Sequence, residues 1–343
     1  MPDSSKLPIE KIVTDIVKTI DREREQEIIS RRFGLYDRKE TLEQIGELLG
    51  ITRERVRQLE KAVVARLKAQ ADGGNLPHVA MVQDALVELL GNMGTVARIT
   101  DITGKLTKDS SRIDQSRVSF MAQLCPKLVV IDDNDYYYHA VGLKGVRDEK
   151  EIKKQVDNII AALKEIGEPT EIEAIAKKVG IQSSKEAAAL ASVSKQLATL
   201  NGMWGLIRWP MVNPKNIRDK IYVILKKHGK HMHFNEIADS IKKSSFKRKD
   251  VTTQAIHNEL IKDKRFVLIG RGIYALKEWG YEKGTVADII TDVLKKSKEP
   301  LHRDEIVKLV LKSRYVKETT ILLNLQGKPQ FKRVAKATYA LAE

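Results

Sequence analysis

The chain is poor in several residues and patterns that mark particular classes of protein. Its 343 residues include one cysteine, so no disulfide can form within the chain, and aromatic residues make up only 5%. No stretch approaches the roughly 18 consecutive apolar residues of a membrane span. The N-terminal sequence MPDSSKLPIEKIV also lacks the basic-then-apolar pattern of a signal peptide. Since 42% of the residues are hydrophobic, we expect a folded, multi-domain cytoplasmic protein.

Motifs that carry catalytic chemistry are missing as well. The single cysteine, Cys125, lies in the apolar stretch MAQLCPKLVVI without a partner histidine, which indicates a small core residue rather than a nucleophile. There is no Walker-type or dinucleotide-binding glycine loop. His228, His231 and His233 lie in an expected turn with no cysteine nearby, so we interpret them as structural or phosphate-contacting rather than as metal ligands. We expect no enzyme activity, no cofactor and no metal.

Positive charge is abundant and unevenly placed. The net charge is +15, and residues 215–283 hold 17 Lys and Arg against 8 Asp and Glu. Residues 284–343 hold 12 against 7, whereas residues 71–214 are close to neutral. A basic domain attracts the phosphate backbone of nucleic acid without reading its sequence. Residues 215–283 therefore favour nucleic-acid binding, while the last 60 residues also fit a merely soluble cationic surface.

The segment from Thr41 to Leu67 has the pattern of two helices joined by a tight turn. Thr41 followed three residues later by Gln44 forms a capping-box sequence, which predicts the start of a helix. Gly50 predicts its end, because glycine adopts the left-handed conformation of a sharp turn at little cost. Thr52 is then placed to cap a short second helix.

The second helix has two different faces. At 100° per residue, Val56, Leu59, Val63 and Leu67 share one side and are expected to pack on the first helix. The opposite side carries Arg53, Glu54, Arg57, Gln58 and Lys61. Arg, Gln and Glu side chains suit guanine, adenine and the cytosine amino group, respectively. This face predicts a helix that reads DNA; the alternative is an ordinary amphipathic helix with a solvated charged face.

The same residues resemble region 4 of bacterial primary sigma factors. The resemblance rests on RRFGL (31–35), TLEQIG (41–46) and TRERVRQLE (52–60). In that family the region reads the upstream (−35) promoter element and contacts the flap of the RNA polymerase β subunit. The resemblance implies that Arg53, Glu54 and Gln58 read bases, and that Arg57 and Lys61 contact bases or the DNA backbone.

The chain also departs from that family. Sigma factors carry large domains ahead of region 4, which bind the polymerase clamp and melt DNA with stacked aromatic residues. Here residues 1–20, expected to form an N-terminal helix, leave no room for those domains upstream of the match. The required aromatic clustering is absent from the rest of the chain as well. We therefore expect a protein that does not melt a promoter alone.

Four weak repeats follow a linker around residues 72–75. Each has a leucine followed twelve positions later by an isoleucine: Leu90 and Ile102, Leu163 and Ile175, Leu225 and Ile237, and Leu294 and Ile306. In each repeat the pattern predicts three helices and a β-hairpin, which together make a winged helix. The hairpins are expected at residues 128–139, around 203–209, at 266–276 and at 331–341.

The predicted fold is mainly α-helical, with a sigma region 4-like helix-turn-helix followed by four tandem winged-helix domains with small β-hairpin wings. The expected boundaries are 1–20, 21–70, 76–145, 149–214, 215–281 and 284–343. Winged helix 3 is expected to have helices at Ile217 to His228, Phe234 to Lys243 and Val251 to Lys262. It ends in GRGIYALKEWG (270–280) and resembles the HARE-HTH family, which includes the N-terminal domain of the RNA polymerase delta subunit.

Winged helix 3 carries its own candidate DNA contacts. In its third helix Ile256 and Leu260 are expected to face inward, which places outward the polar residues Thr253, Gln254, His257 and Asn258. A basic run precedes that helix, at an N-terminus where phosphate is favoured, and a further arginine marks the hairpin tip. These residues are Lys247, Arg248, Lys249 and Arg271.

Winged helices 1 and 2 have a different character. The expected hairpin tip of the first carries Asp132, Asp133 and Asp135, which DNA phosphates would repel, and the second is neutral. We interpret both as protein-binding or spacing modules, with a scaffold that has no partner as the alternative.

Taken together, these features predict a bacterial, sequence-specific DNA-binding transcription regulator that acts in the cytoplasm at the nucleoid. Its expected partners are promoter-like double-stranded DNA and RNA polymerase, through the β flap; no membrane and no small-molecule substrate are expected. Two alternatives stay open: an RNA polymerase-associated interaction subunit akin to delta, and a general nucleoid-binding or restriction-linked DNA-binding protein.

Overall fold

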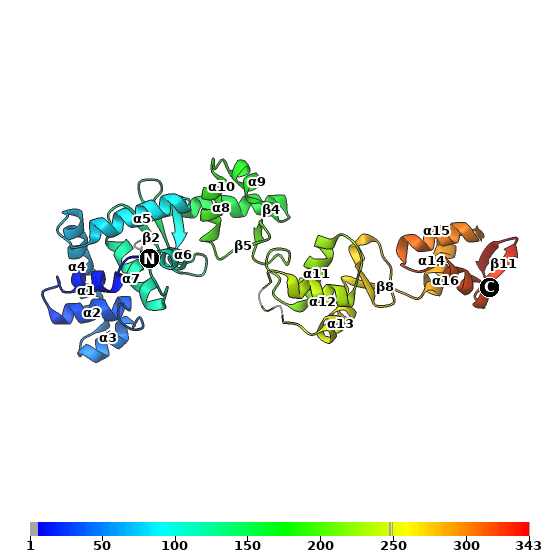
Figure 1. The fold of residues 1–343 in the computed structure, drawn as a ribbon, viewed down its shortest axis with the longest axis horizontal. Helices are drawn as coiled ribbons and strands as arrows, with labels where there is room; N and C mark the ends of the chain where they lie inside the picture. Colours follow the sequence, from blue (N-terminus) through cyan, green and yellow to red (C-terminus); the bar gives the residue numbers. More distant parts are fainter. Residues whose placement is uncertain (1–5, 247, 249, 343) are drawn as a thin grey trace, which may run out of the picture. The chain divides into compact units, whose positions relative to one another are not determined.

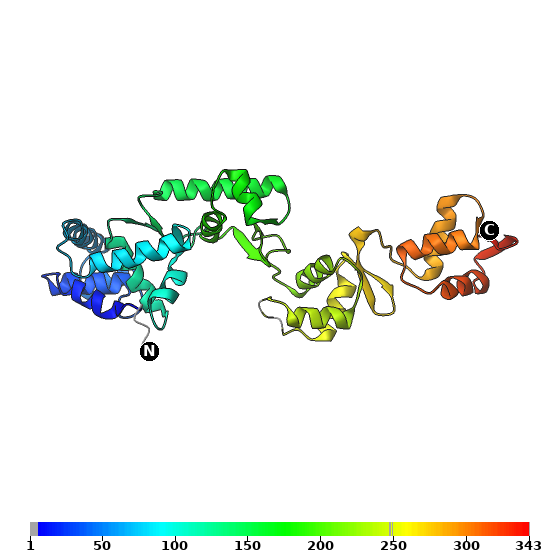
Figure 2. The same ribbon diagram turned by 45° about the horizontal axis from the view of Figure 1, so that its top comes forward.

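The computed structural model describes residues 6–246, 248 and 250–342, and the chain divides into two compact units, Met1–Arg208 and Trp209–Glu343 (Figure 1). Both units are mainly helical and contain small antiparallel sheets. Figures 1 and 2 show helices α1 to α4 gathered at the N-terminal end of the first unit. Within the described residues, no helix is both long enough and apolar enough to cross a membrane.

Four helices open the first unit: α1 (Ile9–Val17), α2 (Glu23–Phe33), α3 (Leu42–Leu49) and α4 (Arg53–Asp72). The Thr41 hydroxyl accepts a hydrogen bond from the Gln44 amide at 3.2 Å, and the Gln44 side chain accepts one from the Thr41 amide at 2.9 Å. Gly50 follows α3 with a left-handed φ of 64°. Thr52 caps α4 by accepting from the Arg55 amide at 3.2 Å. The two predicted helices, their caps and the glycine turn are confirmed.

Helix α4 is longer than the short helix expected from the sequence. It has 20 residues, because no helix breaker occurs before Gly73. Val56 packs with α2 and α3 in a small cluster, whereas Val63 and Leu67 belong to a separate, larger core. The expectation that the whole apolar face packs on α3 was wrong, since α3 has only 8 residues and α4 extends well past it.

The larger core joins the first helices to the next part of the chain. It contains residues of α1, the second half of α4, and the segment that runs to Val141. Phe33 of α2 packs against it, with its ring centroid 4.9 Å from that of the fully buried Phe120. The helix-turn-helix is therefore supported from one side by the segment that follows it.

Four segments with one order of elements complete the chain: a helix, a short strand, two helices and a β-hairpin. The first has α5 (Val79–Met93), β1 (Val96–Arg98), α6 (Ile99–Leu106), α7 (Arg112–Leu124), β2 (Leu128–Ile131) and β3 (Ala140–Leu143). The second has α8 (Glu149–Ile166), β4 (Thr170–Glu171), α9 (Ile172–Val179), α10 (Ser184–Ser192), β5 (Leu197–Leu200) and β6 (Met203–Leu206).

The other two segments form the second unit. The third segment has α11 (Ile217–His228), β7 (Met232–His233), α12 (Phe234–Lys243), α13 (Thr253–Lys262), β8 (Phe266–Gly270), β9 (Ile273–Leu276) and the 3₁₀ turn η1 (Lys277–Trp279). The fourth has α14 (Val286–Ser297), β10 (Leu301–His302), α15 (Arg303–Ser313), α16 (Glu318–Gly327), β11 (Phe331–Ala335) and β12 (Thr338–Leu341). In all four sheets the last strand lies in the middle: β1-β3-β2, β4-β6-β5, β7-β9-β8 and β10-β12-β11.

The repeated leucine and isoleucine occupy equivalent core positions. Each leucine lies near the end of the first helix of its segment, and each isoleucine lies in the second helix. All eight are buried: Leu90, Ile102, Leu163, Ile175, Leu225, Ile237, Leu294 and Ile306. The repeat seen in the sequence is thus a repeat of the hydrophobic core.

Element boundaries agree with the sequence in part. Helices α11 and α12 match the expected ranges, while α13 begins two residues later than expected, because Thr252 caps it through a hydrogen bond from the Ala255 amide. The first hairpin has strands at 128–131 and 140–143, so its second strand lies beyond the expected range. The expected second hairpin, around 203–209, holds only β6, which pairs with β5 across a turn at Asn201 and Gly202.

Candidate nucleic-acid interface

The turn between α3 and α4 is held in a narrow space. The Ile51 amide donates a hydrogen bond to the Gly46 carbonyl at 2.9 Å, and a Cβ added at Gly46 would lie 2.7 Å from the Ile51 carbonyl oxygen. Only glycine leaves room for this approach. Gly50 then supplies the left-handed residue of the turn. The two glycines together set the direction in which α4 leaves α3.

Ion pairs with α2 hold the back of α4. The Arg66 guanidinium lies 2.6 Å from the carboxylate of the buried Glu25, and Arg32 lies 3.3 Å from Glu60. Val56, fully buried between α2 and α3, adds an apolar contact on the same side. These contacts leave the first three turns of α4 with a free outer face.

That outer face carries the five residues selected by the helical wheel. All of them are exposed: Arg53, Glu54, Arg57, Gln58 and Lys61. The face combines hydrogen-bond donors from Arg and Lys, acceptors from Glu, and both from Gln. Such a surface can contact base edges as well as phosphates.

Glu54 is the centre of a hydrogen-bond network on this face. Its carboxylate accepts from Arg57 at 2.8 Å (Nε) and 2.7 Å (the terminal nitrogen), and from Gln58 Nε2 at 3.3 Å. The hydrogen bond from Arg57 lowers the pKa of Glu54 to about 2 and raises the pKa of Arg57. Glu54 is therefore an ionised acceptor at neutral pH, with Arg57 oriented beside it.

Residues 22–69 match the family model for Sigma-70, region 4. The match contains α2, α3 and most of α4, and it confirms the resemblance to region 4 inferred from the sequence.

Curated relatives align over the same part of the chain. RNA polymerase sigma factor sigB of Arabidopsis thaliana is 39% identical over 72 residues, which are 20% of this chain and 13% of that protein. RNA polymerase principal sigma factor HrdC of Streptomyces coelicolor is 55% identical over 47 residues, 13% of this chain and 14% of that protein. RNA polymerase sigma factor SigA of Bacillus sp is 44% identical over 55 residues, 16% and 14%. The chain thus spans only 13–14% of the length of these relatives.

Arg55 extends the network of the region 4-like helix, although the helical wheel does not select it. Its guanidinium donates to Gln58 Oε1 at 3.4 Å, so Gln58 donates to Glu54 and accepts from Arg55. Arg55 lies at the edge of the outer face. Because side chains three residues apart on a helix are neighbours, its position relative to Gln58 is the sequence feature that predicts this contact.

The candidate contacts of the third segment are only partly exposed. Gln254 and Asn258 are exposed on α13 and hydrogen-bonded to each other at 3.0 Å, and Arg271 is exposed in the turn between β8 and β9. Thr253 and His257 are half-buried. The ring of His257 packs between Phe234, at 5.1 Å, and Tyr274, at 6.1 Å.

The basic run before α13 is described only at its centre. Lys247 and Lys249 lie outside the described residues. Arg248 has a left-handed φ of 54°, and its carbonyl accepts a hydrogen bond from the buried Lys220 ammonium at 2.6 Å. The backbone of Arg248 is thereby tied to α11.

The acidic loop of the first segment contacts the second segment. Asp132, Asp133 and Asp135 lie between β2 and β3, and Asp133 pairs with Lys195 at 2.5 Å. The Tyr138 amide donates to the Val193 carbonyl at 2.9 Å, and the Lys195 amide donates to the Tyr136 carbonyl at 2.7 Å. The loop thus forms a contact between two segments of the same unit.

His231, His233 and Cys125 have structural surroundings. His233 caps α12 by accepting from the Asn235 amide at 3.3 Å, and the ring of His231 lies 4.5 Å from that of Tyr315. Among the described residues, no three His, Cys, Asp or Glu side chains gather in a way that could hold a metal ion. Cys125 is buried, and burial raises its pKa to about 12, which confirms that it is a core residue.

Proposed function

We propose that the chain is a sequence-specific transcription regulator of bacterial type that binds promoter-like double-stranded DNA through α3 and α4. The observation that carries this proposal is the exposed, mixed polar face of α4, which follows a glycine-based turn inside the residues that match region 4. In this proposal α4 enters the major groove and α3 lies across the backbone. Arg53, Glu54 and Gln58 read base edges, while Arg57 and Lys61 contact bases or phosphates.

The network around Glu54 suits this task. Because its carboxylate is ionised and exposed, Glu54 can accept a hydrogen bond from a cytosine amino group. Gln58 can form hydrogen bonds with adenine through its side-chain amide once its hydrogen bond to Glu54 is broken. Arg57 stays oriented by Glu54 until a phosphate or a guanine replaces that partner. Each well-formed bidentate contact of this kind discriminates between bases by about 1–3 kcal/mol.

The four segments are, in this proposal, tandem winged helices, with the third similar to HARE-HTH domains. Support comes from their shared order of one helix, a short strand, two helices and a hairpin, and from their shared sheet order. The domain limits proposed from the sequence, 76–145, 149–214, 215–281 and 284–343, each enclose one such segment.

The basic third and fourth segments extend the DNA contact along the duplex. Gln254, Asn258 and Arg271 offer exposed side chains, and the run from residue 247 to 249 adds positive charge. Tethered to the region 4-like helices, such weak modules raise the avidity of the whole chain. The first two segments act as spacers, which the contact between Asp133 and Lys195 supports. RNA polymerase is the second proposed partner, through the region 4-like surface.

Base reading can be tested by comparing two duplexes of equal length and composition, one promoter-like and one scrambled. We expect the chain to bind the promoter-like duplex more tightly, and the Arg53→Ala/Gln58→Ala variant to lose most of this preference, about tenfold or more. The matched control is Lys150→Ala/Lys154→Ala in α8, which changes two exposed residues away from α4 and should keep the preference. Equal affinity of the unchanged chain for both duplexes would contradict base reading.

A further inference from the structure

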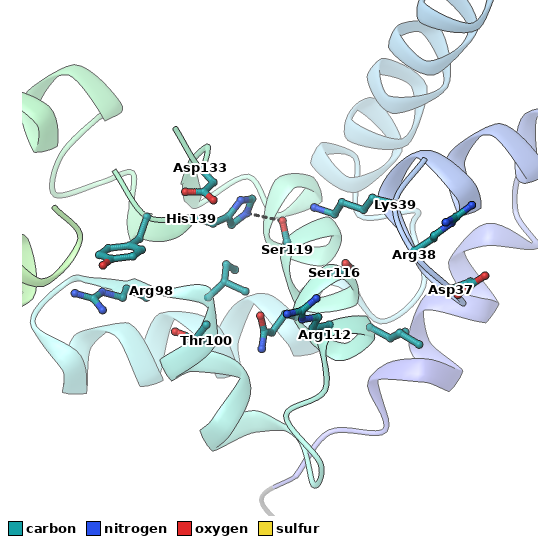
Figure 3. Close-up of a pocket in the computed structure, with 14 residues that line it drawn as sticks. Asp37, Arg38, Lys39, Arg98, Thr100, Arg112, Ser116, Ser119, Asp133 and His139 are labelled. Carbon is teal, nitrogen blue, oxygen red and sulfur yellow. Dashed lines mark hydrogen bonds between the residues drawn. The ribbon is translucent and has the colours of Figure 1, made fainter. Parts of the chain in front are cut away.

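A cavity of about 680 Å³ lies beside the helix-turn-helix in the first unit (Figure 3). Its walls come from three parts of the chain that are far apart in sequence: the loop between α2 and α3, the start of α6 with the start of α7, and the loop between β2 and β3. Four of the lining residues are cationic: Arg38, Lys39, Arg98 and Arg112. The volume falls within the range of small-molecule sites, which is about 300–1,000 Å³.

Positive charge exceeds negative charge around this cavity. The only carboxylates that line it within the described residues are Asp37 and Asp133, and Asp133 is already paired with Lys195 at 2.5 Å. Figure 3 shows Lys39 extending toward the pair formed by Ser119 and His139, whereas Asp37 points away from that pair. Among the described residues, neither Lys39 nor Arg112 has an ion-pair partner. Among the described residues, Lys39 and Arg112 therefore line the cavity without a carboxylate in ion-pair contact.

The charge of Lys39 disfavours the charged form of His139. Burial lowers the pKa of Lys39 and the nearby Arg32 lowers it further, while Asp132 and Asp133 act in the opposite direction. The pKa of His139 is lowered by burial and then by the charge of Lys39, while Asp132 and Asp133 act in the opposite direction. A bound anion between these groups would relieve the repulsion and favour the charged form of both.

Polar groups near the cations complete a site with hydrogen-bonding capacity. The Ser119 hydroxyl lies 2.7 Å from His139 Nε2, and Figure 3 shows Arg112 on the same side of the cavity as Ser116 and Thr100. Arg98 covers the ring of Tyr138, with its guanidinium carbon 4.0 Å from the ring centroid. Arginine, lysine and hydroxyl groups around one hollow are the usual partners of phosphate oxygens.

We propose that this cavity binds the phosphate groups of a phosphorylated ligand, with Lys39 and Arg112 as the main contacts and His139 beside them. The phosphates come either from a free nucleotide-sized molecule or from the DNA backbone, and the size of the cavity favours the free molecule. This site is separate from the outer face of α4, so it goes beyond the proposed reading of DNA and does not depend on it.

The pKa of His139 is the direct readout. In the full chain, the histidine ring signals are followed by NMR over pH, with the His139 signal assigned from a His139→Gln variant. We expect sodium pyrophosphate or ATP to raise the pKa of His139, and Lys39→Gln/Arg112→Gln to weaken binding of either probe by about tenfold or more. Lys39 and Arg112 are exposed, so these changes leave the core intact.

The control and a second arm decide the interpretation. Lys150→Gln/Lys154→Gln removes the same charge from the exposed side of α8 and should keep the response. The His139 signal could instead respond to a short scrambled duplex and not to pyrophosphate or ATP. If that response is lost in Lys39→Gln/Arg112→Gln, the same site is supported, with the DNA backbone as its ligand. No response to any probe, a response that survives in Lys39→Gln/Arg112→Gln, or an equal loss in the control overturns the proposal.

Discussion

The carboxylate of Glu25 in α2 and the guanidinium of Arg66 in α4 form an ion pair at 2.6 Å, across 41 positions of sequence. The Glu25 side chain is only 7% exposed and the Arg66 side chain is 43% exposed. Arg66 therefore neutralises a carboxylate that has little access to water. This pair fastens α4 from the side opposite its proposed DNA-reading face.

Removal of Arg66 should loosen α4 from α2. Because Arg66→Ala leaves the Glu25 carboxylate buried without its main partner, we expect the free energy of opening of these helices to fall by about 1–3 kcal/mol. Hydrogen exchange of the α2 and α4 amides in the full chain measures this change. Glu25→Gln/Arg66→Ala should recover part of the loss, and unchanged exchange in Arg66→Ala would show that the pair contributes nothing.

The Glu54 carboxylate should titrate far below its ordinary range. Its pKa of about 2 arises mainly from the hydrogen bond of Arg57, so Arg57→Ala should raise the pKa toward the ordinary value of 4.5. Since the folded-state pKa is depressed, any stabilisation from this group is complete above about pH 4.5 and lost as the pH falls toward 2. Carbon-detected NMR titration of Glu54 gives the pKa directly. A midpoint near 4.5 in the unchanged chain would contradict the bidentate contact.

Gly94 should not tolerate a side chain. It has a left-handed φ of 92°, and an added Cβ would lie 2.7 Å from the Lys185 carbonyl and 2.9 Å from the Ala189 Cβ of α10. Gly94→Ala therefore forces apart α10 and the end of α5, and we expect a loss of about 1–3 kcal/mol, seen as a lower unfolding temperature of the full chain. Gly91→Ala is the control: an added Cβ there meets nothing within 4 Å inside α5, so it should be neutral or stabilising. Equal effects of the two changes would exclude the close contact as the cause.

Local signals in the sequence predicted most of the helix-turn-helix and of the repeats. Thr41, Gln44 and Gly50 interact with residues close to them in the chain, and each buried leucine is followed by a buried isoleucine at the same separation of twelve positions. The turn at Asn201 and Gly202, both with positive φ, joins β5 to β6, and an Asn-Gly pair is a strong signal for a two-residue hairpin. This pair places the second hairpin at residues 197–206, ahead of the expected range around 203–209.

Contacts between segments could not be predicted from such signals. The apolar pattern of α4 in the sequence indicates that one side of this helix is buried. It does not indicate that Val63 and Leu67 pack against residues outside the helix-turn-helix. The cavity lined by Lys39, Arg98 and Arg112 forms where three parts of the chain that are distant in sequence come together. The hydrophobic periodicity of the sequence does not predict contacts of this kind. These features depend on how folded segments pack, which only the structure reveals.

Arg314 should hold the third and fourth segments together. In the loop after α15, its guanidinium donates to the carbonyls of Leu268 in β8 and Gly284, and the next residue, Tyr315, donates its amide to the Ile269 carbonyl at 3.1 Å. Burial lowers the pKa of Arg314, since its charge is partly removed from water, yet the two carbonyls keep its terminal nitrogens hydrogen-bonded.

Arg314→Ala removes both of these hydrogen bonds at once. The carbonyls of Leu268 and Gly284 lose their charged donor, so the loop should detach from the edge of β8 and expose the Tyr315 amide. We expect hydrogen exchange to accelerate at β8 and at Tyr315 by about tenfold or more, while α11 and α14 stay protected. Arg333→Ala, which removes an exposed arginine that bonds only locally to the Ala335 carbonyl in the described structure, should leave exchange at β8 unchanged. If β8 keeps its protection in Arg314→Ala, the contacts of Tyr315 with Ile269 and His231 are sufficient to join the two segments.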